Sequence, residues 1–342
     1  MSTIKVLDVT LRDGGYRNDF GFTEHYAETL VGRLVDAGVQ YCEIGYCNGS
    51  FARKEEHGMT SLVMPDYISN LKRIAGDRLG LAVMVHPKNV MTSDFEMLRD
   101  NGVSLIRVCL RRDQLAEGLA TLEAAKNLGF VVSANVTHIT SQSMSAVIDT
   151  SVRAEAAGAD IICFADSNGN MIPLDVEKLI SRVFNRVMVP LGFHAHNNLS
   201  LALANAAAAI DNGAEFIDAS VCGMGKGAGN LHLGMIVAYL ERVGLKHNYD
   251  LVRVLELSKY TSATVPKSDL PSPLMDVILG AYNFPFDVSK RMNETIERFQ
   301  LNSEFQAIQI MHEQDQVARF APRAVFNQPS SAGALAIAEG DR

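Results

Sequence analysis

The amino-acid sequence predicts an α/β protein, a (β/α)8 barrel that carries a small helical module at its C-terminal end. Short apolar runs rich in β-branched residues alternate with amphipathic helical stretches, and eight such runs occur. Several helical stretches end at a glycine shortly before the next run, as in "DAGVQYCEIG" and "NLGFVVSA", because glycine accepts the left-handed conformation that closes a helix. A doubly wound open sheet is the alternative, but eight evenly spaced units favour closure into a barrel.

The predicted elements follow one another in a regular order. Strands are expected at residues 4–9, 41–46, 79–85, 104–110, 131–136, 160–165, 191–195 and 215–221. Helices are expected between them, for example at residues 23–37, 114–128, 143–157, 174–187 and 199–213. Repeated strand–helix–strand units imply a parallel sheet with right-handed crossovers.

The pattern changes after Leu245, which suggests three regions. Residues 1–245 are expected to form the catalytic barrel, and residues 246–325 a helical C-terminal module. Within the module, the segments "VPKSDLPSP" and "YNFPFD" interrupt helical patterns. Residues 326–342 contain little that would drive packing, so we expect a flexible tail.

The composition argues against several classes of protein. The 342 residues carry a formal net charge of −8 without a long basic run, so no nucleic-acid partner is expected. No run reaches the ~18 to 20 apolar residues of a membrane span, and the start "MSTIKVLDVT" has no apolar signal region. Five cysteines without a CxxC pair indicate reduced thiols, so we expect a cytoplasmic protein.

Polar residues gather where the predicted strands end. These residues are Asp8, Arg12, Asp13, Glu43, Arg107, Asn135, His138, Asp166, Ser167 and, after the last strand, Asn230. The active sites of (β/α)8 barrels lie at the C-terminal ends of the strands. A simple packed core would not place so many polar groups there, and the sequence therefore predicts an active site at this end of the barrel.

The segment "FHAHNN" ends the seventh predicted strand and carries His194 and His196. Residues two apart in a strand share a face, so both imidazoles can reach one cation. Asp13 is the best placed carboxylate to join them, and two histidines with one carboxylate suit a six-coordinate Mn²⁺ or Mg²⁺ ion. Two hydrogen-bonded structural histidines are the alternative. Asn198 is expected to cap the following helix.

Arg12 directly precedes Asp13, and two roles are open for it. A guanidinium beside a metal-bound carbonyl can stabilise the oxyanion of an enolate. Alternatively, Arg12 forms a structural salt bridge with a carboxylate at a strand end. The later segment "GMGKGAGN" is not a phosphate-binding loop of the Walker type, since no GK[ST] occurs in it. We expect this segment to shape the mouth of the barrel and to present Asn230.

These motifs together resemble a known family. "LDVTLRDGG", "FADSNG" and "GFHAHNNLSLALANAAAAIDNGAEFIDASVCGMGKGAGN" are similar to the HMG-CoA lyase-like and pyruvate carboxyltransferase-like metal-dependent TIM barrels, most of all to the 4-hydroxy-2-oxovalerate aldolases among them. The resemblance covers residues 3 to 245.

The resemblance implies a metal-dependent aldolase or lyase. Asp13, His194 and His196 would hold a divalent cation, commonly Mn²⁺ or Mg²⁺ with Zn²⁺ or Co²⁺ as alternatives, and Asn230 stands where some relatives place a further ligand. Pyruvate or a related 2-oxo acid would chelate the cation, and Arg12 would steady the enolate while the substrate splits into enolate and aldehyde. Glu43, Asn135 and Asp166 are expected to bind substrate.

The sequence departs from these aldolases at one catalytic position. After "TLRDG" they carry a Ser-His pair whose histidine serves as the base, whereas this chain has Gly15 and Tyr16. Tyrosine, with an ordinary pKa of ~10, is a poorer base at neutral pH. Either Tyr16 acts as an acid or hydrogen-bond donor, or another group such as His138 transfers the proton.

Two other functions are alternatives, and two partners are expected. A Claisen-type acyl-CoA:2-oxo acid acyltransferase of the isopropylmalate synthase branch is the first alternative, and a non-catalytic barrel subunit is the second. The resemblance also implies an aldehyde dehydrogenase as a possible partner, and a homodimer is the default expectation for a soluble enzyme.

Overall fold

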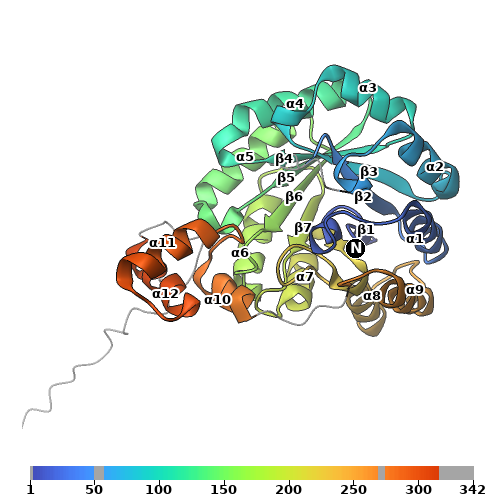
Figure 1. Ribbon diagram of the computed structural model, residues 1–342. Helices are drawn as coiled ribbons and strands as arrows, with labels where there is room; N and C mark the ends of the chain where they lie inside the picture. The colour runs from blue at the N-terminus through green and yellow to red at the C-terminus, as the bar shows by residue number, and fades with distance from the viewer. Residues whose placement is uncertain (1–2, 50–57, 269–273, 316–342) are drawn as a thin grey trace, which may run out of the picture.

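The eight predicted strands close into a parallel barrel in the computed structural model, which describes residues 3–49, 58–268 and 274–315 (Figure 1). Each strand pairs with the next, and the last pairs with the first, so the prediction of a barrel rather than an open sheet is confirmed. The strands are β1 (Lys5–Asp8), β2 (Tyr41–Cys47), β3 (Gly80–Val85), β4 (Leu105–Leu110), β5 (Val131–Val136), β6 (Ile161–Asp166), β7 (Leu191–Ala195) and β8 (Ala214–Ala219).

In the described residues, helices α1 to α8 surround the barrel (Figure 1). They are α1 (Glu24–Asp36), α2 (Pro65–Ala75), α3 (Thr92–Asp100), α4 (Leu115–Asn127), α5 (Met144–Ala156), α6 (Pro173–Phe184), α7 (Ala202–Asp211) and α8 (Leu233–Arg242). Short 3₁₀ helices lie at η1 (Gly14–Arg17), η2 (Met59–Ser61), η3 (Pro87–Asn89), η4 (Arg112–Gln114), η5 (Ile139–Ser141) and η6 (Val221–Gly223). All five individually predicted helices are present, with ends that differ by a few residues.

The glycines predicted to end helices do so. Gly38, Gly102, Gly129, Gly158 and Gly213 all have positive φ angles. One cap prediction was wrong, because the side chain of Asn197 rather than Asn198 accepts the backbone N–H of Ala202 at the start of α7, at 3.2 Å.

Inward-facing side chains change in character along each strand. At the N-terminal ends of the strands the barrel holds an apolar cluster that includes Leu7, Leu105 and Phe216. Two residues further along, β4 and β8 carry the buried charged residues Arg107 and Asp218. Because i and i+2 share a face, the same strands supply an apolar base and a charged middle layer to one interior.

The C-terminal helices divide between the barrel and a separate lobe. Helix α9 (Leu251–Thr264) packs on α1 and α8 and adds Val254 and Leu257 to the main core. Helices α10 (Leu274–Tyr282), α11 (Ser289–Phe299) and α12 (Glu304–Gln314) enclose an apolar cluster of their own and lie beside α6 and α7 (Figure 1). The predicted tail, residues 326–342, lies outside the described residues.

The side chain of Asn283 ties this lobe to the barrel. Its Oδ1 accepts hydrogen bonds from Thr140 Oγ1 at 2.6 Å and from Asn168 Nδ2 at 2.7 Å, and its Nδ2 donates to the Thr140 carbonyl at 2.9 Å. The residues just after Asn283, Pro285 to Asp287, thereby lie at the mouth of the barrel. No helix in the described part of the chain is both long and apolar enough to cross a membrane.

Gly38 and Gly129 allow a matched test of the helix ends. Both have positive φ, but a Cβ at Gly38 would lie 2.3 Å from the Asn248 carbonyl oxygen, whereas a Cβ at Gly129 would have nothing within 4 Å. Gly129→Ala should lower the free energy of unfolding by about 1–2 kcal/mol through backbone strain alone. Gly38→Ala should cost roughly a further 1–3 kcal/mol through the overlap. Thermal and urea unfolding of both variants measure this, and equal losses would contradict it.

Candidate functional site

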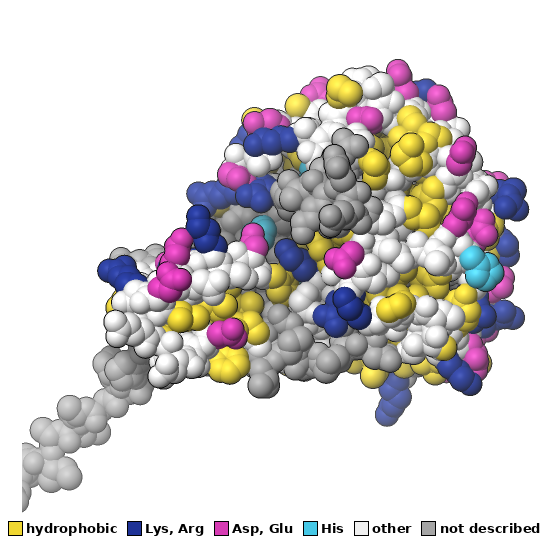
Figure 2. Space-filling model, viewed as in Figure 1, with side chains coloured by type: hydrophobic (Ala, Val, Ile, Leu, Met, Phe, Trp, Pro, Cys, Tyr) yellow, Lys and Arg dark blue, Asp and Glu magenta, His cyan; other side chains and the backbone are white. Residues whose placement is uncertain are grey.

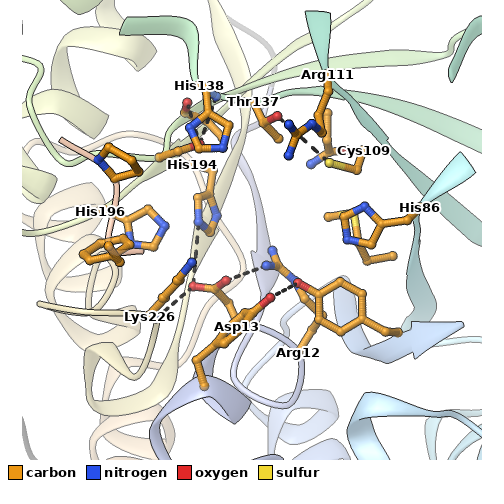
Figure 3. A pocket seen from close by; sticks show the side chains of 18 of the residues that line it. Arg12, Asp13, His86, Cys109, Arg111, Thr137, His138, His194, His196 and Lys226 are labelled. Carbon is orange, nitrogen blue, oxygen red and sulfur yellow. Dashed lines mark hydrogen bonds and ion pairs between the residues drawn. The ribbon is translucent and has the colours of Figure 1, made fainter. Parts of the chain in front are cut away.

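The three residues chosen as metal ligands meet at the C-terminal end of the barrel (Figure 3). Asp13 immediately precedes η1, His194 lies on β7, and His196 directly follows β7. One ligand atom from each side chain lies within 4.8 Å of the others, and all three residues are buried. The spacing of two residues in "HAH" does place both imidazoles on the same side of the strand, with ring centroids 5.1 Å apart.

The protonation of this triad suits a divalent cation. His194 Nδ1 lies 2.9 Å from Asp218 Oδ2, so the ionised Asp218 accepts the proton of Nδ1, and the other ring nitrogen, Nε2, faces Asp13 Oδ2 at 3.9 Å. Burial lowers the pKa of His196 to about 3, which keeps its ring neutral, and its Nδ1 has no hydrogen-bond partner among the described residues. Two imidazole nitrogens and a carboxylate oxygen match the donor set of a divalent ion.

Asn230 braces Asp13 from the glycine-rich loop. Its Nδ2 donates to Asp13 Oδ2 at 2.8 Å and to the Met224 carbonyl at 3.1 Å, while its buried Oδ1 has no partner among the described residues. A Cβ at Gly225 would lie 2.5 Å from the Asn230 side chain, so only glycine leaves room for this amide. The loop therefore presents Asn230 to Asp13, and its role as a further metal ligand stays a prediction.

A chain of buried ion pairs connects two members of the triad, Asp13 and His194. It runs from Asp13 through Arg12, Glu43, Arg107 and Asp218 to His194. Arg12 Nε lies 2.7 Å from Glu43 Oε2, Arg107 Nη1 lies 3.1 Å from the same oxygen, and Arg107 Nη2 lies 2.6 Å from Asp218 Oδ2. Arg12 thus forms structural salt bridges, one of the two roles expected of it. It also lines the cavity.

These ion pairs keep the carboxylates of Asp13 and Asp218 ionised. Burial alone would raise the pKa of Asp13, but Arg12 and the hydrogen bond from Asn230 hold that pKa well below its ordinary value. Burial likewise opposes ionisation of Asp218, and Arg107 and His194 lower its pKa. Each buried negative charge is therefore offset by an adjacent guanidinium, as buried charges require.

A cavity of about 270 Å³ opens beside the triad, and in Figure 2 a hollow lies between the C-terminal lobe and the barrel. Besides the triad, the predicted residues that line the cavity are Arg12, Tyr16, Asn135, His138 and Ser167. Its size suits a small molecule rather than a polymer.

Glu43 and Asp166, also predicted to bind substrate, are fully buried and do not line the cavity. Glu43 positions Arg12 through the ion pair already described. The Asp166 carboxylate accepts the backbone N–H groups of Asn170 at 3.1 Å and Met171 at 3.0 Å, so it holds the loop that follows β6. Burial raises the pKa of Asp166 to about 6.

The two candidates for proton transfer have different surroundings. The Tyr16 hydroxyl lies 3.0 Å from that of Tyr46, and burial raises the pKa of Tyr46 well above its ordinary value. Burial lowers the pKa of His138, and the cations Arg111 and Lys226 lower it further. His138 is therefore neutral at pH 7 and able to accept a proton.

Several cavity residues were not singled out from the sequence. His86 and Arg111 directly follow strands β3 and β4, so the rule of looking at strand ends would have found both. Lys226 lies in the glycine-rich loop. Phe286 comes from the C-terminal lobe and stands 5.5 Å from the His196 ring, centroid to centroid. No periodicity in the sequence indicates this last contact.

Comparison with known proteins agrees with this geometry. The model of the HMGL-like family matches residues 3–260. The 4-hydroxy-2-oxovalerate aldolase of Moorella thermoacetica is 31% identical over 285 residues, which are 82% of this chain and 84% of that protein. A protein of the same name from Geobacillus genomosp. 3 is 31% identical over 278 residues, 80% of this chain and 78% of that protein.

Solved structures show the same architecture. The N-terminal domain of a putative aldolase from Bacteroides vulgatus matches with a TM-score of 0.76 at 28% identity, over 90% of this chain and 100% of that one. The HMG-CoA lyase of Brucella melitensis matches with a TM-score of 0.66 at 20% identity, over 77% of this chain and 99% of that one, and shares the fold. With its metal-compatible triad in an HMGL-like barrel, this chain belongs to the HMGL-like family.

Proposed function

We propose that this chain is a divalent-metal-dependent aldolase that cleaves a 4-hydroxy-2-oxo acid into a 2-oxo acid, such as pyruvate, and an aldehyde, and that catalyses the reverse addition. The observation that carries the proposal is the buried triad of Asp13, His194 and His196 with Arg12 beside it at one cavity. The relatives named 4-hydroxy-2-oxovalerate aldolase, which match about four-fifths of the chain, support the same reaction.

The triad would hold Mn²⁺ or Mg²⁺, since nitrogen and oxygen donors with open positions suit these ions, and Zn²⁺ or Co²⁺ are alternatives. When bound, such an ion supplies Lewis acidity toward the 2-oxo group of the substrate. Asp218 prepares the site by fixing the tautomer of His194. Asn230 does so by holding the Asp13 carboxylate in place.

Arg12 is positioned to stabilise the charge that develops during cleavage. Its guanidinium is held by Glu43 and Asp13, so it need not reorganise as the reaction proceeds. When the bond between C3 and C4 breaks, its electron pair passes to C3, and the 2-oxo oxygen becomes that of an enolate. Arg12 faces the cavity where this oxygen would lie.

His138 is the base that we favour for the 4-hydroxyl proton. Its ring is neutral at pH 7, whereas the Tyr16 hydroxyl is hydrogen-bonded to Tyr46. In this assignment Tyr16 donates a hydrogen bond to the oxygen at C4, and His138 takes the hydroxyl proton from that oxygen. Once the aldehyde has left, the same proton can return to C3 of the enolate.

The alternative functions, the partners and the cellular location have less support than the aldolase reaction. The acyltransferase and the non-catalytic barrel have no specific support in the described residues. A homodimer and an aldehyde dehydrogenase partner stay predictions from the family resemblance. None of the five cysteines, all of which the structure describes, forms a disulfide, and four of them are buried, which supports a reducing, cytoplasmic location.

Removing one imidazole of the triad tests the metal site. His194→Ala should abolish stoichiometric Mn²⁺ binding and lower metal-dependent oxaloacetate decarboxylation, which also generates pyruvate enolate, by about 100-fold or more. His247→Ala is the matched control, because His247 lies in the segment before α9, away from the cavity lining. Metal analysis after dialysis, together with the decarboxylation assay, measures both effects. Unchanged metal content in His194→Ala would refute the site.

The choice of base makes a prediction about pH. A base must be neutral to act, and the pKa of His138 lies below its ordinary value, so aldol cleavage should fall only as pH drops below about 6.5. His138→Gln should remove this acidic limb and lower kcat for cleavage by about 10²- to 10⁴-fold. Decarboxylation involves no 4-hydroxyl and should lose far less.

Tyr16→Phe provides the comparison on the same two reactions. We expect a cleavage loss of about 10-fold with the acidic limb retained, because only a hydrogen bond is lost. If Tyr16→Phe instead removed the acidic limb while His138→Gln kept it, Tyr16 would be the base.

A further inference from the structure

Lys226 brings a positive charge to the side of the cavity where the triad lies (Figure 3). It belongs to the glycine-rich loop between η6 and α8, and its backbone N–H donates to Asp13 Oδ2 at 3.4 Å. The next residue, Gly227, passes so close to Phe286 that a Cβ there would overlap the ring. The backbone at Lys226 is therefore fixed beside the triad, and its half-buried side chain enters the cavity.

Two aromatic rings that line the cavity hold the ammonium of Lys226. Its Nζ lies 5.5 Å from the centre of the Tyr16 ring and 5.4 Å from that of the Phe286 ring. Both distances are within the range of cation–π attraction, which positions an ammonium without neutralising its charge. The Phe286 ring in turn stands 5.5 Å from that of His196, centroid to centroid, so the ammonium is held near the triad.

The charge of Lys226 has no acidic partner in the part of the chain that the structure describes. The described cavity lining includes two carboxylates, Asp13 and Asp287, and Lys226 forms an ion pair with neither. Burial lowers the pKa values of His196 and His138, and the ammonium of Lys226 contributes to both shifts. Its positive field therefore extends from the triad across the cavity.

Positive charge exceeds negative charge at this side of the cavity once a divalent cation is bound. Asp13 is the one carboxylate of the triad, so it offsets only part of the charge of such an ion. The ammonium of Lys226 adds to the surplus. A 2-oxo acid carries one negative charge and its enolate carries two, so both offset the surplus, the enolate more fully. Lys226 is thus matched to an anion at the metal rather than to the metal.

The carboxylate of the 2-oxo acid is the group that Lys226 is placed to meet. A 2-oxo acid chelates a cation through its oxo oxygen and one carboxylate oxygen, and the other carboxylate oxygen then points away from the ion. Figure 3 shows Lys226 and Arg12 on opposite sides of Asp13. Because Arg12 serves the oxo oxygen in the proposed reaction, the ammonium on the opposite side is left for the outer carboxylate oxygen.

We propose that Lys226 binds the carboxylate of the 2-oxo acid and thereby makes this enzyme require an acid group next to the oxo group. This inference rests on the proposed aldolase function and names the residue that selects its first substrate. Nζ would donate a charge-assisted hydrogen bond to the outer carboxylate oxygen. A 2-oxo compound without a carboxylate would leave the ammonium without an anion, and such sites reject analogues that lack the expected polar group.

Oxalate binding tests the inference without turnover, because oxalate is an unreactive mimic of pyruvate enolate. Lys226→Met keeps the approximate length of the side chain and removes its charge. It should raise the Kd of oxalate for the Mn²⁺-loaded protein about 10- to 100-fold, since a hydrogen bond to a charged group is lost. Lys226→Arg keeps the charge and should retain most of the affinity. Titration calorimetry measures all of these constants.

Mn²⁺ binding separates a role in substrate binding from a structural one. Removing a cation beside the triad lowers the repulsion toward Mn²⁺, so Lys226→Met should bind the ion as tightly as the wild type or more tightly. A disrupted loop would instead displace Asn230 and Asp13 and weaken the binding of Mn²⁺ and oxalate together. Lys246→Met is the matched control, because Lys246 is exposed and outside the cavity lining, and it should change neither constant.

The addition of pyruvate to propanal shows which substrate Lys226 serves. In Lys226→Met, KM for pyruvate should rise about 10-fold or more, whereas KM for propanal should stay within about two-fold of the wild-type value. A contact with the aldehyde would reverse this pattern.

The outcomes separate the two proposals. If the wild type binds no Mn²⁺, or no oxalate when Mn²⁺ is present, the aldolase function itself is overturned. The role of Lys226 alone is overturned if Lys226→Met binds oxalate like the wild type, loses Mn²⁺ together with oxalate, or loses affinity for propanal instead of pyruvate. Weaker binding of oxalate and pyruvate, with Mn²⁺ binding kept or tightened, supports the inference.

Discussion

The site depends on one chain of buried ion pairs that crosses the barrel interior. Arg12, Glu43, Arg107 and Asp218 alternate in charge and come from the β1–η1 connection, β2, β4 and β8. Burying one such charge alone would cost several kcal/mol, so each is tolerated only because its neighbours are present. Loss of one member would leave others unpaired in the interior, and the geometry at both ends of the chain would relax.

The ion pairs hold in place two residues of the triad, Asp13 at one end of the network and His194 at the other. Arg12 contacts Asp13, and Asp218 contacts His194, so the network links two members of the triad through the barrel interior. The orientation of His194 and the ionisation of Asp13 both follow from this arrangement. A cation-binding site is thereby prepared by residues that do not themselves touch the cavity, as Glu43 illustrates.

The C-terminal lobe completes the mouth of the cavity. Phe286 stands next to the His196 ring, and the Lys226 ammonium lies 5.4 Å from the centre of the Phe286 ring. Gly227, with φ +60, passes so close that a Cβ there would overlap Phe286. Since Asn283 fastens this segment to the barrel, the lobe limits the space above the triad.

Local patterns in the sequence determined the architecture and the metal-compatible triad. Strand and helix periods, glycines after helices, and the two-residue spacing of His194 and His196 are properties of short segments, and all appear in the structure as predicted. The position of Arg12 and Asp13 at the end of the first predicted strand added these two residues, and the family motifs raised the question of Tyr16.

Only the tertiary structure decided which polar strand-end residues face the cavity. Glu43 and Asp166 follow the same local pattern as Asn135, yet pairing with Arg12 and with backbone N–H groups keeps them out of the cavity lining. Phe286 reaches His196 across 90 residues of chain through the docking of the lobe. Such partners come from segments far apart in the sequence, and no local period records which side chains will meet.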